Sequence, residues 1–264
     1  MLNRNVDRSA AAIDTLKKEF GAGADVTFVH LDLGALDTVR KGAANVLARV
    51  SRIDALICNA AIAHMPTREL TVDGFEAHFG VNHLGHFLLC GLLFDRIEES
   101  AGRIVMVGSK GYKFGAKRIY FEDIDFERKY DSHNPYYQSK LAQVMFGYEL
   151  QRRAQAAAKK ITIQVCHPGA SRTNLLNDTA SFALKASWAV LSLFAQSAEK
   201  GSWPETLCVV EEEVESNKMY APTTLEMVGP IGEVPIDPCA LDRESAAKLW
   251  TVSEEKTGLS WLHI

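Results

Sequence analysis

The chain has 264 residues, of which 47% are hydrophobic and 23% charged, and its net charge is -4. That length suits one α/β domain, and the composition is ordinary for a soluble globular protein. A negative balance without a long basic run gives no indication of nucleic-acid binding. Five cysteines without a Cys-x-x-Cys pair suggest neither a disulfide framework nor a metal site. A reducing, cytoplasmic compartment fits best, and we expect no membrane span.

Predicted strands alternate with predicted helices along the chain. Short β-branched or almost wholly apolar runs indicate buried strands, and longer runs with apolar residues at helical spacing indicate helices. Asn134 is expected to cap a helix that begins at Pro135. In chain order we expect a strand over 26–31, a helix over 37–50, a strand over 54–58, a helix over 75–94, a strand over 103–107, a helix from 134 to about 158, a strand over 161–166, a helix over 197–214, a strand over 218–220 and a helix over 243–255. This alternation predicts a doubly wound parallel sheet.

Polar or turn-forming residues follow several of the predicted strands. In doubly wound sheets, ligands bind beyond the carboxyl ends of the strands. The residues at such ends are therefore candidates for one site. They are Asp32, the run Asn59-Ala60-Ala61, Ser109 and the pair Pro168-Gly169.

Tyr136 and Lys140 stand four residues apart, so they share one face of their predicted helix. A cation close to a phenol favours the phenolate and lowers its pKa from about 10. A phenol tuned in this way suits a carbonyl or an alcohol whose carbon gains or loses a hydride. The hydroxyl of Ser109 could hold the reacting oxygen. The pair alone is a weak signal, because a half-buried tyrosine beside a solvated lysine has the same spacing.

Several motifs, in order, resemble the short-chain dehydrogenase/reductase superfamily. They are Cys58-Asn59-Ala60-Ala61, Asn82-His83-Leu84-Gly85-His86-Phe87, the trio Ser109, Tyr136 and Lys140, and Pro168-Gly169 followed by Thr173. Three further segments are similar to the retinol-dehydrogenase-like branch, namely 121–124, 136–142 and 248–254. The resemblance implies one Rossmann-like domain over 1–264 and an oxidoreductase that interconverts a carbonyl and an alcohol on a small molecule.

The resemblance also implies catalytic roles. Tyr136 would donate or accept the proton, and Ser109 would hydrogen-bond the reacting oxygen. Lys140 would bind the nicotinamide ribose and lower the pKa of Tyr136. Asn82 would interrupt the hydrogen bonding of its helix and hold a water in a proton relay to Lys140. The cofactor would carry the hydride.

Cofactor-binding residues follow from the same resemblance. Asp32 would contact the adenine, although it could merely cap a turn. Asn59, with Ala60 and Ala61 after it, would lie beside the adenosine ribose. The backbone of Pro168 and Gly169 and the hydroxyl of Thr173 would hold the nicotinamide carboxamide.

Arg4 bears on the choice of cofactor, because it stands where the family's second strand would end. An arginine there accommodates the 2′-phosphate of NADP, whereas an acidic residue would accept the ribose hydroxyl of NAD. NADP is therefore preferred, with NAD as the alternative. A solvated arginine near a chain end is the competing interpretation.

The substrate is expected to bind in a lobe over about 174–240. An apolar stripe there either packs in the core or lines an apolar substrate pocket, as the resemblance suggests. The stripe consists of Phe182, Trp188, Leu191 and Phe194. The sequence fixes neither the substrate nor the oligomeric state, although a homo-oligomer is compatible with it.

The family normally begins with a strand, a glycine-rich turn and a helix that cradle the cofactor pyrophosphate. No Gly-x-x-x-Gly-x-Gly occurs before Val26, so the first strand and the first helix are missing. Because that strand lies at the centre of the sheet, we expect no bridge between the strands over 26–31 and 54–58. Either Met1 is an internal methionine, or the chain is a shortened, catalytically weak binding or interaction protein.

Overall fold

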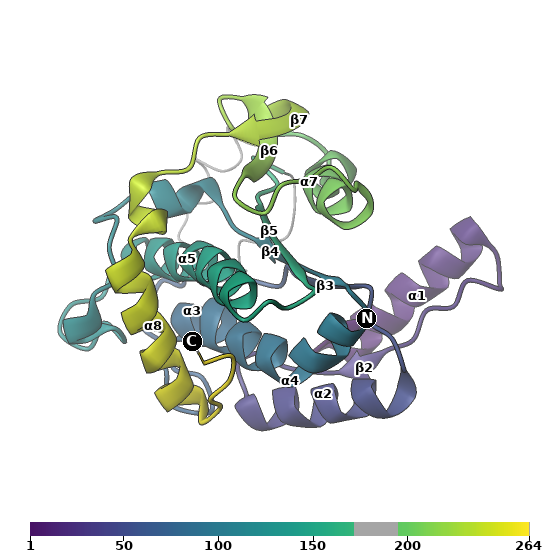
Figure 1. Ribbon diagram of the computed structural model, residues 1–264, viewed down its shortest axis with the longest axis horizontal. Helices are drawn as coiled ribbons and strands as arrows, with labels where there is room; N and C mark the ends of the chain where they lie inside the picture. Colours follow the sequence, from purple (N-terminus) through teal and green to yellow (C-terminus); the bar gives the residue numbers. More distant parts are fainter. Residues whose placement is uncertain (172–194, 264) are drawn as a thin grey trace.

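The computed structural model describes residues 1–171 and 195–263 (Figure 1). Its main sheet has the strand order β3-β4-β5-β6-β7, in which the first four strands are parallel and β7 is antiparallel to β6. A separate parallel pair is formed by β1 and β2. The strands are β1 (Leu2–Asn3), β2 (Val29–His30), β3 (Ala55–Cys58), β4 (Arg103–Val107), β5 (Thr162–Cys166), β6 (Met219–Thr224) and β7 (Val228–Val234).

Helices surround the two sheets. They are α1 (Val6–Phe20), α2 (Leu36–Arg49), α3 (Ala77–Phe79), a π-helical turn (Gly80–Leu84), α4 (Gly85–Glu99), α5 (Asn134–Ala156), α7 (Ala198–Val210) and α8 (Arg243–Thr257), with 3-10 turns at Lys110–Lys113, Phe121–Asp123 and Pro238–Leu241. Figure 1 shows α4, α5 and α8 on one side of the main sheet and α7 on the other. The predicted doubly wound fold is therefore confirmed.

Several predicted boundaries were wrong. The strand expected over 26–31 is only Val29–His30, and α7 ends at Val210 rather than at 214. The antiparallel β7 was not predicted. Asn134 is the first residue of α5 and not its cap. His133 occupies the N-cap position without a side-chain capping bond, and Asp131 supplies the acceptor from two residues earlier, because its Oδ1 accepts the N–H groups of His133 and Asn134 at 2.8 Å each.

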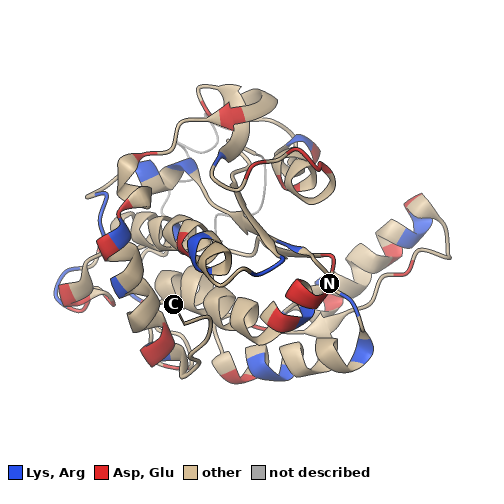
Figure 2. Ribbon diagram, in the orientation of Figure 1, with Lys and Arg blue, Asp and Glu red and all other residues tan. Residues whose placement is uncertain are grey.

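An apolar core helix runs from Ala77 to Glu99. By length and composition it could cross a membrane, but 83% of its most apolar window is buried inside the protein. Figure 2 shows that the charges of α4 lie near its C-terminal end, whereas α1, α2 and α8 carry both signs along their length. Aromatic side chains fix α8 against α4 and α5, since Trp250 lies 5.1 Å from Phe87 and 5.8 Å from Phe146 between ring centroids. The helix from Ala77 to Glu99 therefore packs as part of the core of the protein.

The pair β1–β2 is not joined to β3 within the described residues, as the sequence predicted. A cavity of about 290 Å³ lies between them, lined by Leu2 and Arg4 on one side and by Leu56 and Ile57 on the other. The Ile57 side chain is 44% exposed although it belongs to a strand of the main sheet. One edge of β3 therefore faces this cavity instead of a neighbouring strand.

Because one edge of β3 is open, replacing an isoleucine by alanine should destabilise the protein less in β3 than in β4. Ile104 is fully buried in β4, so Ile104→Ala should lower the free energy of unfolding by about 2–4 kcal/mol. Ile57→Ala should lower it by less than about 1 kcal/mol, since much of that side chain already contacts solvent. Urea unfolding of the two variants checks this, and equal losses would show that Ile57 is covered in solution.

Candidate active site

The phenol of Tyr136 meets the hydroxyl of Ser109 at the end of β4. Tyr136 lies in the first turn of α5, and its Oη donates to Ser109 Oγ at 3.1 Å. Ser109 Oγ also accepts the N–H of Gly111 at 3.1 Å, which caps the following 3-10 turn. Helix α5 packs on β4 and β5, so the packing itself brings these two hydroxyls together. The predicted juxtaposition of Ser109 and Tyr136 is therefore present.

The prediction that Lys140 lowers the pKa of Tyr136 was wrong. Burial raises this pKa above its ordinary value, while the hydrogen bond with Ser109 opposes the rise only in part. The expected source of the lowering, the Lys140 ammonium, is held by other partners. Tyr136 is consequently a neutral phenol at neutral pH, with a proton to donate.

Lys140 lies buried between the ends of two strands. Its Nζ donates to the Val107 carbonyl at 3.0 Å and to Gln143 Oε1 at 2.9 Å. The amide of Gln143 in turn donates to the Cys58 carbonyl at 3.1 Å, so α5 is tied to β3 and β4. Burial lowers the pKa of Lys140 to about 8, against the opposing charge of Glu205. The ammonium is thus held at the strand ends in an environment that disfavours its charge.

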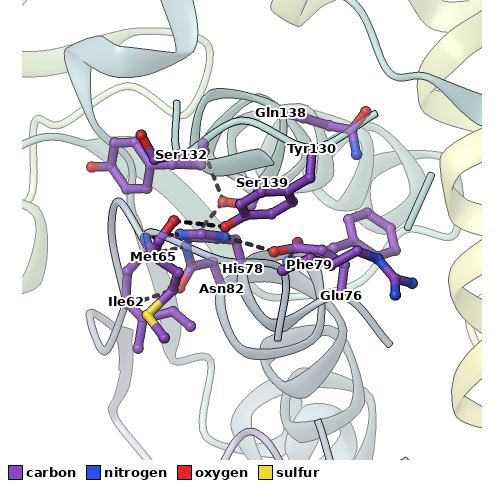
Figure 3. A network of polar contacts seen from close by, with 12 residues as sticks. Ile62, Met65, Glu76, His78, Phe79, Asn82, Tyr130, Ser132, Gln138 and Ser139 are labelled. Carbon is purple, nitrogen blue, oxygen red and sulfur yellow. Dashed lines mark hydrogen bonds and ion pairs between the residues drawn. The ribbon is translucent and has the colours of Figure 1, made fainter. Parts of the chain in front are cut away.

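Asn82 lies in the π-helical turn, so the helix is interrupted where the sequence predicted. Its Nδ2 donates to the Ile62 carbonyl and to Ser139 Oγ at 2.9 Å each, and its Oδ1 accepts the Ile62 N–H at 2.8 Å. The side chain thereby joins the loop after β3 to α5 (Figure 3). The proton relay expected of Asn82 stays a prediction.

A buried hydrogen-bonded pair, Glu76 and His78, lies beside Asn82, and sequence reasoning missed it. Glu76 and His78 are both fully buried, with His78 Nδ1 2.7 Å from Glu76 Oε1 (Figure 3). His78 Nε2 accepts the Met65 N–H at 3.3 Å, which places the imidazole proton on Nδ1. Tyr130 Oη donates to the Met65 carbonyl at 2.8 Å. The spacing of Glu76 and His78, two residues apart at the start of a helix, could have indicated this contact from the sequence.

His64 is a second residue that the sequence did not single out. Its ring centroid lies 4.7 Å from that of Tyr136, and its Nδ1 is 3.2 Å from the Ser132 carbonyl. Burial lowers the pKa of His64 to about 4. A neutral imidazole therefore packs against the phenol at neutral pH.

Two cavities contain most of the predicted site residues. The larger, of about 510 Å³, is lined by Asn59, Ala60, Ala61, Ser109, Tyr136, Lys140, Pro168, Gly169 and Glu205. The smaller is the cavity beside β3, and its lining includes Arg4, Asp32 and the run Asn59-Ala60-Ala61. The two cavities share this run, so they adjoin.

The two cavities differ in the polar groups that line them. Carbonyls, hydroxyls and the Lys140 ammonium surround the larger one, and Arg4 and Asp32 line the smaller one. Asp32 caps a turn, since its Oδ1 accepts the Gly34 N–H at 2.9 Å, and its contact with adenine stays a prediction. Thr173 and the stripe over 182–194 lie outside the described residues.

Comparisons with known proteins show the family of the chain. A family model described as short chain dehydrogenase matches residues 1–120. Mouse retinol dehydrogenase 14 is 37% identical over 97% of this chain and 77% of its own length, and human retinol dehydrogenase 13 is 36% identical over 97% and 76%. The crystal structure of an uncharacterized protein from Mycobacterium paratuberculosis superposes with a TM-score of 0.77 at 33% identity, covering 98% of this chain and 84% of that one.

The chain belongs to the short-chain dehydrogenase family, in its retinol-dehydrogenase-like branch. It is an NAD(P)-dependent oxidoreductase of alcohol and carbonyl substrates. The family and the reaction class expected from the motifs are confirmed.

The buried ammonium of Lys140 predicts a stability that depends on pH. Its pKa is about 8 in the folded chain and about 10.4 when unfolded. Between these values the unfolded chain binds more protons, so the free energy of unfolding should rise with pH by about 1–3 kcal/mol. Lys140→Met should lack this rise and gain relative stability near pH 7.

Chemical unfolding of both proteins at pH 7 and pH 10 measures the effect. Lys17→Met, at an exposed position of α1, is the matched control and should keep the rise. Parallel pH profiles for Lys140→Met and the unmodified chain would show that Lys140 is solvated.

Proposed function

We propose that the chain interconverts an aldehyde or ketone and the corresponding alcohol on an apolar substrate, with NADP as cofactor. The observation that carries the proposal is the contact between Tyr136 and Ser109 in the wall of the cavity that also contains Lys140. When bound, the nicotinamide cofactor supplies or accepts the hydride. The protein then has to hold the substrate oxygen and move one proton.

Tyr136 is the proton donor in the reduction direction. Burial keeps its phenol protonated, and its Oη–H can turn from Ser109 to the oxygen of the substrate. Ser109 Oγ already accepts hydrogen bonds from Tyr136 and Gly111, which leaves its own hydrogen to donate. That hydrogen can steady the developing negative charge on the substrate oxygen.

Lys140 and the strand-end backbone hold the nicotinamide half of the cofactor. The Lys140 ammonium can donate to the ribose hydroxyls while it remains bonded to the Val107 carbonyl. Arg4 lines the adjoining cavity with Asp32 and Asn59, where a guanidinium suits a 2′-phosphate. This placement of Arg4 supports NADP over NAD.

The names of the relatives support the apolar substrate. Several relatives that cover nearly the whole of this chain are named retinol dehydrogenases, and retinol is an apolar primary alcohol. Aldehydes with a long apolar chain are therefore the first substrates to test.

Tyr136→Phe should reduce turnover by about 10²-fold or more, because the variant lacks the proton donor. Binding of NADPH should be unchanged, since the phenyl ring keeps its place against Gly111 and His64. The assay is NADPH oxidation with a panel of aldehydes, ketones and retinoids, alongside NADPH fluorescence. Tyr137→Phe, on the neighbouring residue, is the control. Unchanged turnover in Tyr136→Phe would refute the assignment.

Arg4→Glu should reverse the cofactor preference. The carboxylate would repel the 2′-phosphate and accept a ribose hydroxyl instead, so the Kd of NADPH should rise about tenfold or more relative to that of NADH. Fluorescence titration with both cofactors measures the ratio. Arg8→Glu makes the same charge change on exposed α1 and should leave the ratio alone. A ratio unchanged by Arg4→Glu would show that Arg4 is merely solvated.

A further inference from the structure

The tip of the β6–β7 hairpin adopts a conformation that its residues disfavour. Met227 N–H donates to the Thr224 carbonyl at 3.0 Å, so Leu225 and Glu226 are the two central residues of a tight turn. Both have positive φ angles, of 52° and 56°. Asn-Gly or Gly-Gly normally fills such turns, because other side chains are strained there. Something in the surrounding structure therefore holds this tip in place.

Two lysines from the active-site turn hold the hairpin tip. Lys113 Nζ lies 2.8 Å from each carboxylate oxygen of Glu226 and donates to the Pro235 carbonyl at 2.6 Å. Lys110 Nζ donates to the Leu225 carbonyl at 2.6 Å. Both lysines belong to the 3-10 turn that Ser109 caps. The hairpin tip is thus bound directly to the turn that positions the Ser109 hydroxyl.

The same tip contacts the loop after β5. His167 Nδ1 accepts the Gly169 N–H at 3.2 Å, so the imidazole carries its proton on Nε2, which lies 3.4 Å from Glu226 Oε2. The Ala170 N–H donates to the Met227 carbonyl at 2.8 Å. A Cβ atom at Gly169 would lie 2.4 Å from that carbonyl oxygen, so the loop and the tip approach closely.

Glu226 is the group that the two sides share. Its side chain is 18% exposed, that of Lys113 15% and that of His167 1%, so solvent screens these contacts less than it screens surface pairs. Hydrogen bonds from His167 and Lys113 lower the pKa of Glu226 to about 2, which leaves the carboxylate ionised at neutral pH. One carboxylate thereby joins the turn after β4 to the loop after β5.

We propose that Glu226 is a positioning residue that fixes the loop over 168–170 relative to Ser109 and so shapes the nicotinamide end of the cofactor site. The proposal rests on the proposed function, because it assumes that this loop holds the cofactor. Pro168 and Gly169 line the same cavity as Ser109, Tyr136 and Lys140. Residues held in an unfavourable backbone conformation often lie at functional sites. Glu226 has such a conformation, and its side chain reaches the loop after β5.

Paired glycine substitutions separate positioning from strain. Glu226→Gly relieves the left-handed conformation and removes the carboxylate, whereas Leu225→Gly relieves the same conformation and keeps the carboxylate. Leu225 is 80% exposed, so its side chain contributes little packing. Lys113→Met provides a second variant that removes the contact from the other side, together with the bond to the Pro235 carbonyl, and leaves the hairpin residues Leu225 and Glu226 unchanged.

The first readout is hydrogen exchange of the backbone amides of His167, Gly169 and Ala170 without added cofactor. We expect Glu226→Gly and Lys113→Met to exchange about tenfold faster there than Leu225→Gly. The second readout is NADPH binding and turnover. The KM and Kd of NADPH should rise about fivefold or more in those two variants, with kcat changed by less than about threefold.

Equal exchange and equal NADPH affinity in Glu226→Gly and Leu225→Gly would overturn the proposal. Failure of the unmodified chain to bind either NADPH or NADH would instead refute the proposed function. The exchange comparison needs no cofactor, so it still decides whether Glu226 fixes the loop.

Discussion

The packing of α5 against β4 and β5 is the constraint on which the site depends. Tyr136, Ser139, Lys140 and Gln143 lie along one side of this helix. Tyr136 and Lys140 contact Ser109 and Val107 at the end of β4, Gln143 contacts Cys58 at the end of β3, and Ser139 contacts Asn82 in the π-helical turn. Because a helix repeats every 3.6 residues, only a helix can present these positions together. A shift of α5 by one turn would separate the phenol from Ser109 and the ammonium from the Val107 carbonyl.

Local periodicity predicted the fold class and the placement of Ser109, Tyr136 and Lys140, whereas the role of Asn82 and the cofactor contacts were expected only from the resemblance. Apolar strands placed Asn59, Ser109 and Pro168 at strand ends, and helical spacing placed Tyr136 beside Lys140 on one face. The pKa of Tyr136 could not be predicted in the same way. It depends on how deeply the ring is buried and on where Lys140 directs its hydrogen bonds, and both are consequences of tertiary packing.

Interactions between residues far apart in the chain were also beyond sequence reasoning. Glu226 and Lys113 are separated by 113 positions, and nothing in either local sequence indicates the other. The residue types of Leu225 and Glu226 are not those that usually fill a two-residue hairpin turn, so the sequence gave no local signal for β7. Asp131 was overlooked as the acceptor at the start of α5 because Asn134 and Pro135 form the more familiar start signal.

In the reaction proposed for this site, a hydride would pass from a bound nicotinamide cofactor to a carbonyl carbon, while Tyr136 gives the proton. The most direct test supplies NADPH deuterated at the transferred position, together with retinal or another apolar aldehyde, and locates the label by mass spectrometry. We predict one deuterium on the carbinol carbon of the alcohol product. Alcohol formed without deuterium at that carbon, or no alcohol at all, would contradict the account.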